Sequence, residues 1–253
     1  MSFLPVHLNH FGAALRFITV LPAGPAETYH PREMIPFFPA VGLVLGVILA
    51  FADAVFSAFF APAVVGAMDV MVLAALTGAL HLDGLADTAD GLFAHKDRQS
   101  ALSIMKDSRI GVMGAVALIC LLLTKYGTFT ALAAGGQAGW IKFLILVLIP
   151  AYARAAMIFG IRFLPYARPE GGTGSDLFSE PLRPVEYWGV LACVLLSLLL
   201  GWRAVLINAV FFITCAGLIG FYRRRMGGIT GDMLGAMCEI TETTLLISAA
   251  AGL

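Results

Sequence analysis

Charged residues are scarce in this sequence. Only 13% of its 253 residues are Asp, Glu, Lys or Arg, and 60% are hydrophobic, whereas soluble proteins carry roughly 25% charged residues. So little charge predicts an integral membrane protein rather than a soluble globule. The 16 basic and 16 acidic residues cancel and form no basic stripe, which argues against a nucleic-acid partner.

Cysteine is scarce as well. Cys120, Cys193, Cys215 and Cys238 lie inside apolar runs without the paired spacing of a zinc site or a disulfide framework, so we expect them to be small core residues. The stretch Met1–Leu21 lacks the ordered basic start, compact apolar core and small-residue cleavage site of a signal peptide. We therefore expect no cleaved signal peptide.

Long apolar runs, in contrast, are abundant. A helix needs about 20 mostly apolar residues to cross a bilayer, and seven segments fit this pattern, with six or eight as near alternatives. No Pro/Gly/Ser-rich linker separates them, so residues 1–253 are expected to form a single all-α domain, a polytopic membrane helix bundle. The expected spans are Phe37–Phe59, Pro62–Leu80, Ile110–Ala134, Ile141–Phe163, Tyr187–Leu200, Ala204–Tyr222 and Met233–Leu253.

A further helix is expected before the first span. Residues His7–Leu21 place apolar side chains at helical spacing, with His10 and Arg16 on the other side. This pattern predicts an N-terminal helix that lies in the membrane interface, or one that packs against the bundle.

Positive charge is sorted between the two ends of the predicted spans. One side receives only Lys142 and Arg203, and the positive-inside rule makes the other side cytoplasmic and the C-terminus external. The motif-like segments fall on the cytoplasmic side, as expected of an enzyme with a cytosolic substrate, whereas a transporter keeps its key polar groups near mid-membrane. The cytoplasmic basic residues are Arg16, Arg32, Lys96, Arg98, Lys106, Arg109, Arg162, Arg168, Arg183, Arg223, Arg224 and Arg225.

One segment concentrates carboxylates at the end of an apolar run. Within His81–Gly91, Asp83, Asp87 and Asp90 fall at i, i+4 and i+7 and share one face if the segment is helical. No Lys or Arg lies nearby to relieve their repulsion in a region of low dielectric. A hard cation such as Mg²⁺ would relieve it and usually carries substrate phosphates on its other positions. A solvated helix end is the alternative.

Two basic segments lie on the same predicted side. Lys106, Asp107 and Arg109 stand at the mouth of the third span, where the two cations either hold phosphate oxygens or anchor the chain. The glycine-rich loop Leu164–Ser175 contains Arg168 and offers backbone N–H groups to an anion, although it lacks the full Walker pattern. A flexible connector is the alternative for this loop.

Three ionisable residues are expected deeper in the bundle. Asp232 and Glu239 share a face of the last span, with Glu239 about 10 Å further along the helix. Arg154 lies at a comparable depth in the fourth span and is the expected partner of Glu239, in a functional or a purely structural pair. His81, just before the aspartates, is either a base or a satisfied residue at a helix end.

Together these segments resemble the cobalamin synthase family, the membrane-bound adenosylcobinamide-GDP ribazoletransferases. The resemblance runs along the whole chain and is most specific in the aspartate segment. It rests on Phe17–Pro22, Phe38–Pro39 with Gly42, His81–Gly91, Lys106–Gly114, Leu164–Arg168 with its glycine loop, and Gly227–Asp232 with Glu239.

The resemblance implies a phosphoryl transfer. The ribose 3′-hydroxyl of α-ribazole, or of its 5′-phosphate, attacks the cobinamide-side phosphate of adenosylcobinamide-GDP, and GMP leaves. It also implies Mg²⁺, with Mn²⁺ as the alternative, and places the protein in the bacterial inner (cytoplasmic) membrane with a cytoplasmic active face. The implied partners are the two substrates, the lipid bilayer, a second copy of the chain and other cobalamin-assembly enzymes.

The resemblance further implies roles for individual residues. Asp83, Asp87 and Asp90 would be metal ligands, Asp232 a further ligand or the base, and His81 another catalytic candidate. The substrate contacts would come from Lys106, Asp107, Arg109, Arg168 and Glu239.

Two rival functions remain open at this stage. A CDP-alcohol phosphotransferase also uses an aspartate-rich helix, but its usual Asp-Gly then Ala-Arg order is not matched, since Asp87 follows Ala86. An ion-coupled transporter would instead use Asp53, Asp69, Arg154 and Glu239 as a relay.

Overall fold

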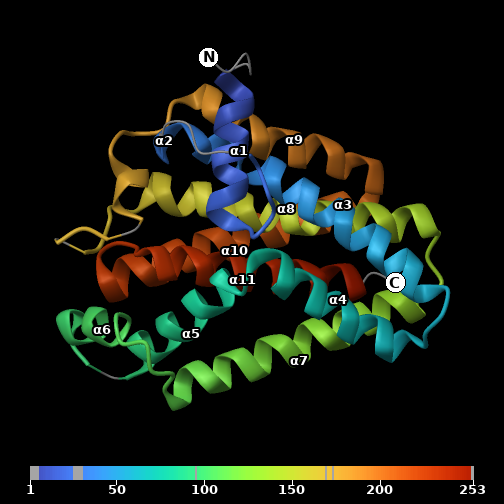
Figure 1. The fold of residues 1–253 in the computed structure, drawn as a ribbon, viewed down its shortest axis with the longest axis horizontal. Coiled ribbons are helices and arrows are strands. Elements are labelled where there is room, and N and C mark those ends of the chain that lie inside the picture. The colour runs from blue at the N-terminus through green and yellow to red at the C-terminus, as the bar shows by residue number, and fades with distance from the viewer. Residues whose placement is uncertain (1–5, 25–30, 95, 169, 173, 252–253) are drawn as a thin grey trace.

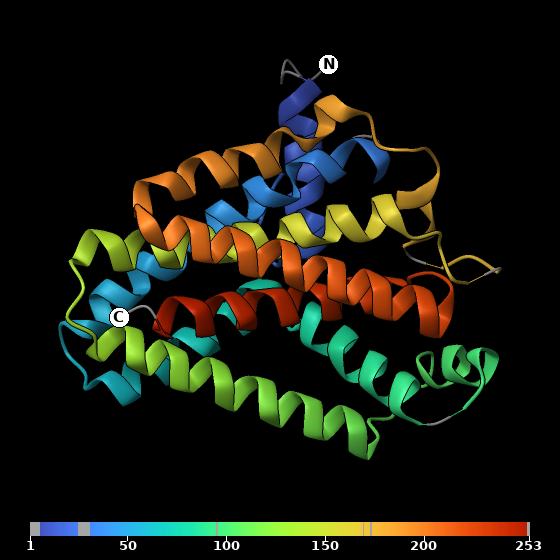
Figure 2. The same cartoon turned by 180° about the vertical axis from the view of Figure 1, so that it is seen from behind.

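The computed structural model describes residues 6–24, 31–94, 96–168, 170–172 and 174–251, and most of these residues are helical. Figures 1 and 2 show long helices that run in broadly the same direction. The α-helices are α1 Val6–Ile18, α2 Pro31–Met34, α3 Phe38–Ser57, α4 Pro62–Thr77, α5 Leu80–Phe93, α6 Arg98–Ile104, α7 Val112–Ala134, α8 Gly139–Phe163, α9 Trp188–Ser197, α10 Trp202–Met226 and α11 Gly231–Ala251. Short 3₁₀ turns cover Ile35–Phe37, Ser175–Phe178, Pro184–Tyr187 and Leu198–Leu200.

Within the described residues, a helix covers most of each predicted span, which confirms the all-α membrane bundle. Five helices of the described chain are long and apolar enough to cross a membrane, and α4 with α5 makes a sixth if that bent pair is one span. The count of seven is not confirmed because α4 has 16 residues, about 24 Å of helix, and the apolar helix over Pro184–Leu200 is also short.

The core of the bundle lies along α8 and α11, whose side chains are mostly buried. Helix α3 packs closely on α8 through Gly42 and Gly46. A Cβ added to Gly42 would lie 2.4 Å from the carbonyl oxygen of Pro150, and one added to Gly46 would lie 2.3 Å from that of Val147. The small-residue spacing therefore marks helix packing, as is typical of membrane proteins.

The N-terminal helix α1 runs across the long helices rather than along them (Figures 1 and 2). Ala14, Leu15 and Ile18 on one side of α1 are buried. The predicted N-terminal helix is therefore present, and it packs against the bundle.

The two ends of the bundle differ in charge. The corner between α5 and α6, the end of α8 and the junction of α10 with α11 gather at one end, on the left of Figure 1. Arg225 there donates hydrogen bonds to the carbonyl oxygens of Leu92 and Lys96, and Arg223 donates to that of Phe163. The segments that carry the candidate motifs therefore meet at this basic end.

Candidate active site

The chain turns by 91° between α4 and α5. Gly78 and Ala79 both adopt left-handed backbone conformations with φ of 58°, a region that costs a residue other than glycine roughly 1–2 kcal/mol. The N–H of Ala79 caps α4 by donating to the carbonyl oxygen of Ala74. The carbonyl oxygen of Ala79 accepts the N–H of Asp83 in α5. This turn directs α5 across the start of α11.

The aspartate segment is helical, as predicted. On α5, Asp83 is exposed, whereas Asp87 and Asp90 are half-buried. The carboxylates of Asp83, Asp232 and Asp90 all act electrostatically on Asp87, and the cation opposing them is Arg168. The fold thus adds Asp232 of α11 to the carboxylates of α5, which sequence reasoning had joined only by resemblance.

Close backbone packing holds α5 against α11. Gly84 faces the backbone of Asp232, and Gly235 faces the backbone of His81, where an added Cβ would lie 3.2 Å from the Cα. These two glycines allow the first turn of α11 to lie beside the aspartate face.

Asp90 joins α5 to α7 through hydrogen bonds. Its Oδ2 accepts the N–H of Gly111 at 2.7 Å, and its Oδ1 accepts the N–H of Gly114 at 2.8 Å. These N–H groups belong to the start of α7, where a helix favours negative charge. Gly111 and Gly114 therefore allow the start of α7 to lie close to the neighbouring helix α5.

Arg168 reaches Asp232 because two loops pair. The N–H of Ala167 donates to the carbonyl oxygen of Ile229, and the N–H of Ile229 donates to the carbonyl oxygen of Pro165, both at 2.9 Å. Arg168 Nη2 then lies 2.6 Å from Asp232 Oδ2, while its Nε is buried and has no hydrogen-bond partner among the described residues. The predicted substrate-binding arginine is therefore anchored at the carboxylates.

The other predicted substrate residues lie nearer the surface. Lys106 Nζ is 3.3 Å from Glu170 Oε2, and both side chains are largely exposed. Arg109 pairs with Asp107, and its hydrogen bonds lower the pKa of Asp107 to about 2. These residues come to the same end of the bundle as the aspartates, but no bond between the two sets is found in the described chain.

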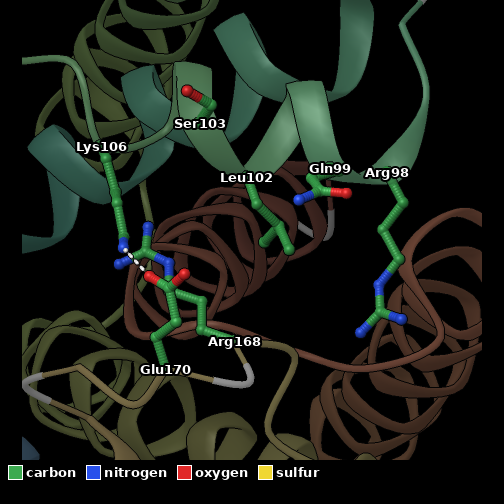
Figure 3. Close-up of a pocket in the computed structure, with 7 residues that line it drawn as sticks. All are labelled: Arg98, Gln99, Leu102, Ser103, Lys106, Arg168 and Glu170. Carbon is green, nitrogen blue, oxygen red and sulfur yellow. Dashed lines mark hydrogen bonds and ion pairs between the residues drawn. The ribbon is translucent and has the colours of Figure 1, made fainter.

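A cavity of about 530 Å³ opens beside Arg168. Figure 3 shows Lys106, Arg168 and Glu170 on one side of it and Arg98 on the other, with Gln99 and Leu102 of α6 between them. Ser103 completes the lining. Sequence reasoning missed the contribution of α6, whose only signal was a charged and polar start after the aspartate helix.

Comparison with known proteins identifies the family. A family model described as cobalamin-5-phosphate synthase matches residues 10–250. The chain belongs to the cobalamin-5-phosphate synthase family. A protein of Acetivibrio thermocellus is 33% identical, covering 91% of this chain and 93% of its own, and one of Syntrophobacter fumaroxidans is 38% identical, covering 96% and 98%. Both are named adenosylcobinamide-GDP ribazoletransferase. No solved structure matches the chain.

This cobalamin-5-phosphate synthase family member also carries a buried ion network, and it corrects one prediction. Glu239 does not pair with Arg154. Instead, Lys125 Nζ lies 2.6 Å from Glu239 Oε2 and 2.6 Å from Glu242 Oε1, and Arg154 pairs with the other oxygen of Glu242. Arg154 on α8 and Glu239 on α11 lie at similar depths in the bundle. Their depth alone does not show whether the two side chains face each other.

Lys125 was missed altogether, although a lone lysine within the apolar run of α7 is itself a signal. The network extends to His81, whose Nδ1 lies 3.5 Å from Arg154 Nη2. His81 is only 2% exposed, unlike the exposed Asp83 on the same helix. This position favours the interpretation of His81 as a structural residue at the start of α5.

The proposed transporter relay is not continuous. Asp53 pairs with Lys142 at 2.6 Å, and Asp69 is fully buried beside Asp53. Arg154 and Glu239 belong to the other network, and no ion pair within the described residues joins the two groups.

The carboxylates fit magnesium by donor chemistry rather than as a closed cage. In the described ranges, no three His, Cys, Asp or Glu side chains stand close enough to hold one metal ion. Mg²⁺ in proteins usually binds one or two carboxylates and completes its coordination with water and substrate phosphates. Asp83 and Asp87 offer such oxygen donors, whereas both oxygens of Asp90 already accept N–H groups.

Proposed function

We propose that this chain is an adenosylcobinamide-GDP ribazoletransferase of the cytoplasmic membrane, with Mg²⁺ as its metal. Family membership and the names of its relatives support the reaction class. The observation that carries the proposal is the meeting of Asp83, Asp87 and Asp232 with Arg168 beside a cationic cavity. Carboxylates for a metal and cations for phosphates are what phosphoryl transfer requires.

The reaction forms and breaks one P–O bond. The ribose 3′-oxygen of α-ribazole, or of its 5′-phosphate, bonds to the cobinamide-side phosphorus, and the bond from that phosphorus to the GMP oxygen breaks. The proton of the hydroxyl passes to a base, and GMP leaves with the bonding electron pair. The product is adenosylcobalamin, or its 5′-phosphate when the acceptor is phosphorylated.

Each nearby residue has a task in this scheme. Asp83 and Asp87 would hold Mg²⁺, which when bound neutralises charge on the diphosphate. Arg168 orients the phosphates through donors that Asp232 does not use, and Asp232 serves as the base or, in place of one of these two aspartates, as a metal ligand. Asp90 holds the start of α7 in place, so its metal role is the weakest of the three aspartates on α5.

The location follows from charge. The basic end of the bundle would face the cytoplasm under the positive-inside rule, which puts the cavity within reach of soluble nucleotides. A bacterial inner membrane fits this orientation, as do the bacterial relatives. Homo-oligomers and contacts with other cobalamin-assembly enzymes stay predictions.

The direct test is synthesis by purified protein in lipid nanodiscs. The protein, adenosylcobinamide-GDP, α-ribazole 5′-phosphate and Mg²⁺ should yield adenosylcobalamin 5′-phosphate and GMP in equal amounts. A CDP-alcohol phosphotransferase would leave these substrates unchanged and release CMP from a CDP-alcohol. A transporter would form no product with either set, and either result would overturn the proposal.

A further inference from the structure

We propose that the cavity beside Arg168 binds a nucleoside 5′-phosphate, with its phosphate toward Lys106 and Arg168 and its base against α6. This inference deepens the proposed function and rests on it, because GMP and α-ribazole 5′-phosphate both have this chemistry. The experiment below is chosen to separate the two nucleotides.

The charge of the cavity favours an anion. Arg98, Lys106 and Arg168 line it, and Glu170 is the acid among the lining residues. Arg98 spends one N–H on the carbonyl oxygen of Ala167, at 2.9 Å, and retains its other guanidinium donors. Clefts lined by one sign of charge concentrate ligands of the opposite sign.

Lys106 can turn to a ligand at little cost, and Arg168 retains a donor for one. The pair of Lys106 with Glu170 is 3.3 Å long and its side chains are 50% and 84% exposed, so solvent screens it strongly. The Nε of Arg168 is buried without a partner among the described residues. A phosphate oxygen would satisfy this donor, which supplies the stabilisation that a buried unpaired N–H lacks.

The size and the remaining lining select a nucleotide. A volume of about 530 Å³ lies within the range of small-ligand pockets, roughly 300–1,000 Å³, and is too small for a whole corrinoid nucleotide. Leu102 offers an apolar surface for a flat base, and the amide of Gln99 offers both a donor and an acceptor to its edge. Figure 3 places both side chains between the cations.

The cavity also adjoins the candidate reaction centre. Arg168 contacts Asp232, which acts electrostatically on Asp87. A phosphate bound at Arg168 would therefore stand next to the proposed metal ligands. A nucleotide that leaves or attacks during phosphoryl transfer must place its phosphate or its ribose there.

The test is equilibrium binding to the full chain in lipid nanodiscs, measured by calorimetry. GMP, α-ribazole 5′-phosphate and inorganic phosphate are titrated separately into the parent, Lys106→Gln, Gln99→Leu and the control Arg224→Gln. Arg224 is an exposed arginine in the last turn of α10, outside the cavity. Thermal melting of each variant shows that it is folded.

At least one nucleotide should bind about tenfold more weakly to both Lys106→Gln and Gln99→Leu, and equally well to Arg224→Gln. The nucleotide that responds is the occupant. Unchanged nucleotide affinity in the two cavity variants would overturn the inference, as would inorganic phosphate that binds as tightly as the nucleotides.

Turnover measured on the same samples separates the two proposals. Product formation with unchanged nucleotide affinity in the cavity variants overturns this inference alone. Nucleotide binding that depends on Lys106 and Gln99, in a parent that makes no product, overturns the proposed function and leaves a nucleoside-phosphate site.

Discussion

Gly84 of α5 lies directly against the backbone of Asp232 at the start of α11. A Cβ added to Gly84 would lie 2.7 Å from the carbonyl oxygen of Asp232 and 3.1 Å from its Cα. The nearest obstacle is backbone, which cannot rotate away as a side chain can. The spacing between the aspartate face and Asp232 therefore depends on the missing side chain at position 84.

Gly84→Ala should push α5 away from α11 and misplace the carboxylates. Displacements of about 1 Å at a reaction centre can lower the rate about a hundredfold, and overpacking typically costs 1–3 kcal/mol of stability. The measurements are turnover and thermal melting in nanodiscs. Gly127→Ala in α7 is the matched control, because a Cβ there meets nothing within 4 Å. Parent-level turnover in Gly84→Ala would contradict the argument.

The buried network predicts unequal effects for its two glutamates. Glu242 contacts both Lys125 and Arg154, whereas Glu239 forms an ion pair with Lys125. Glu242→Gln leaves two buried cations short of a partner, and breaking a buried pair costs about 3–5 kcal/mol. Glu242→Gln should therefore melt at a lower temperature than Glu239→Gln. Equal melting temperatures would mean that the carboxylates share the cations evenly.

The buried network and the aspartate helix show which features could be predicted from the sequence. The helices and the aspartate face were predictable because hydrophobicity and the i, i+4 period are local properties. The partner of Glu239 was not, because it depends on which sides of α7, α8 and α11 face each other. The turn into α5 was equally hidden, since Ala79 is not a residue type that favours a left-handed conformation.

The task of Asp90 was hidden for a related reason. The sequence shows no cation near the aspartates, but it does not show backbone N–H groups that a neighbouring helix supplies. Gly111 and Gly114 follow Asp90 by 21 and 24 residues, and only the packing of α5 on α7 brings them to its carboxylate.

Charge sorting predicts the orientation in the membrane. A reporter fused after Leu253 should be active outside the cytoplasm, and one inserted after Ser108, between α6 and α7, should report the cytoplasm. Paired alkaline phosphatase and green fluorescent protein fusions measure the two states. An odd number of crossings that starts from a cytoplasmic N-terminus places the C-terminus outside. A cytoplasmic signal from the C-terminal fusion would contradict this topology. The bent pair of α4 and α5 would then need a different path.

Metal binding predicts different outcomes for Asp87→Asn and Asp90→Asn. Each removes a charge, and the activity of Asp87→Asn should fall by orders of magnitude if its carboxylate holds Mg²⁺. Asp87→Asn should fold at least as well as the parent without metal, because it relieves repulsion from Asp83, Asp232 and Asp90. Asp90→Asn should also lose about 1–3 kcal/mol, because an amide has one oxygen for two N–H donors.

Thermal melting with and without Mg²⁺ separates these effects from misfolding. A ligand at a hundred times its Kd stabilises the folded state by about 2.7 kcal/mol, so the parent should melt higher with Mg²⁺. The Mg²⁺-dependent increase in melting temperature should vanish in Asp87→Asn. Excess Mn²⁺ should partly restore the activity of the variant that has lost the weakest metal ligand. Near-normal turnover and an intact Mg²⁺ response in Asp87→Asn would refute the assignment. The aspartate face would then be a solvated helix end, with Asp90 kept for its hold on α7.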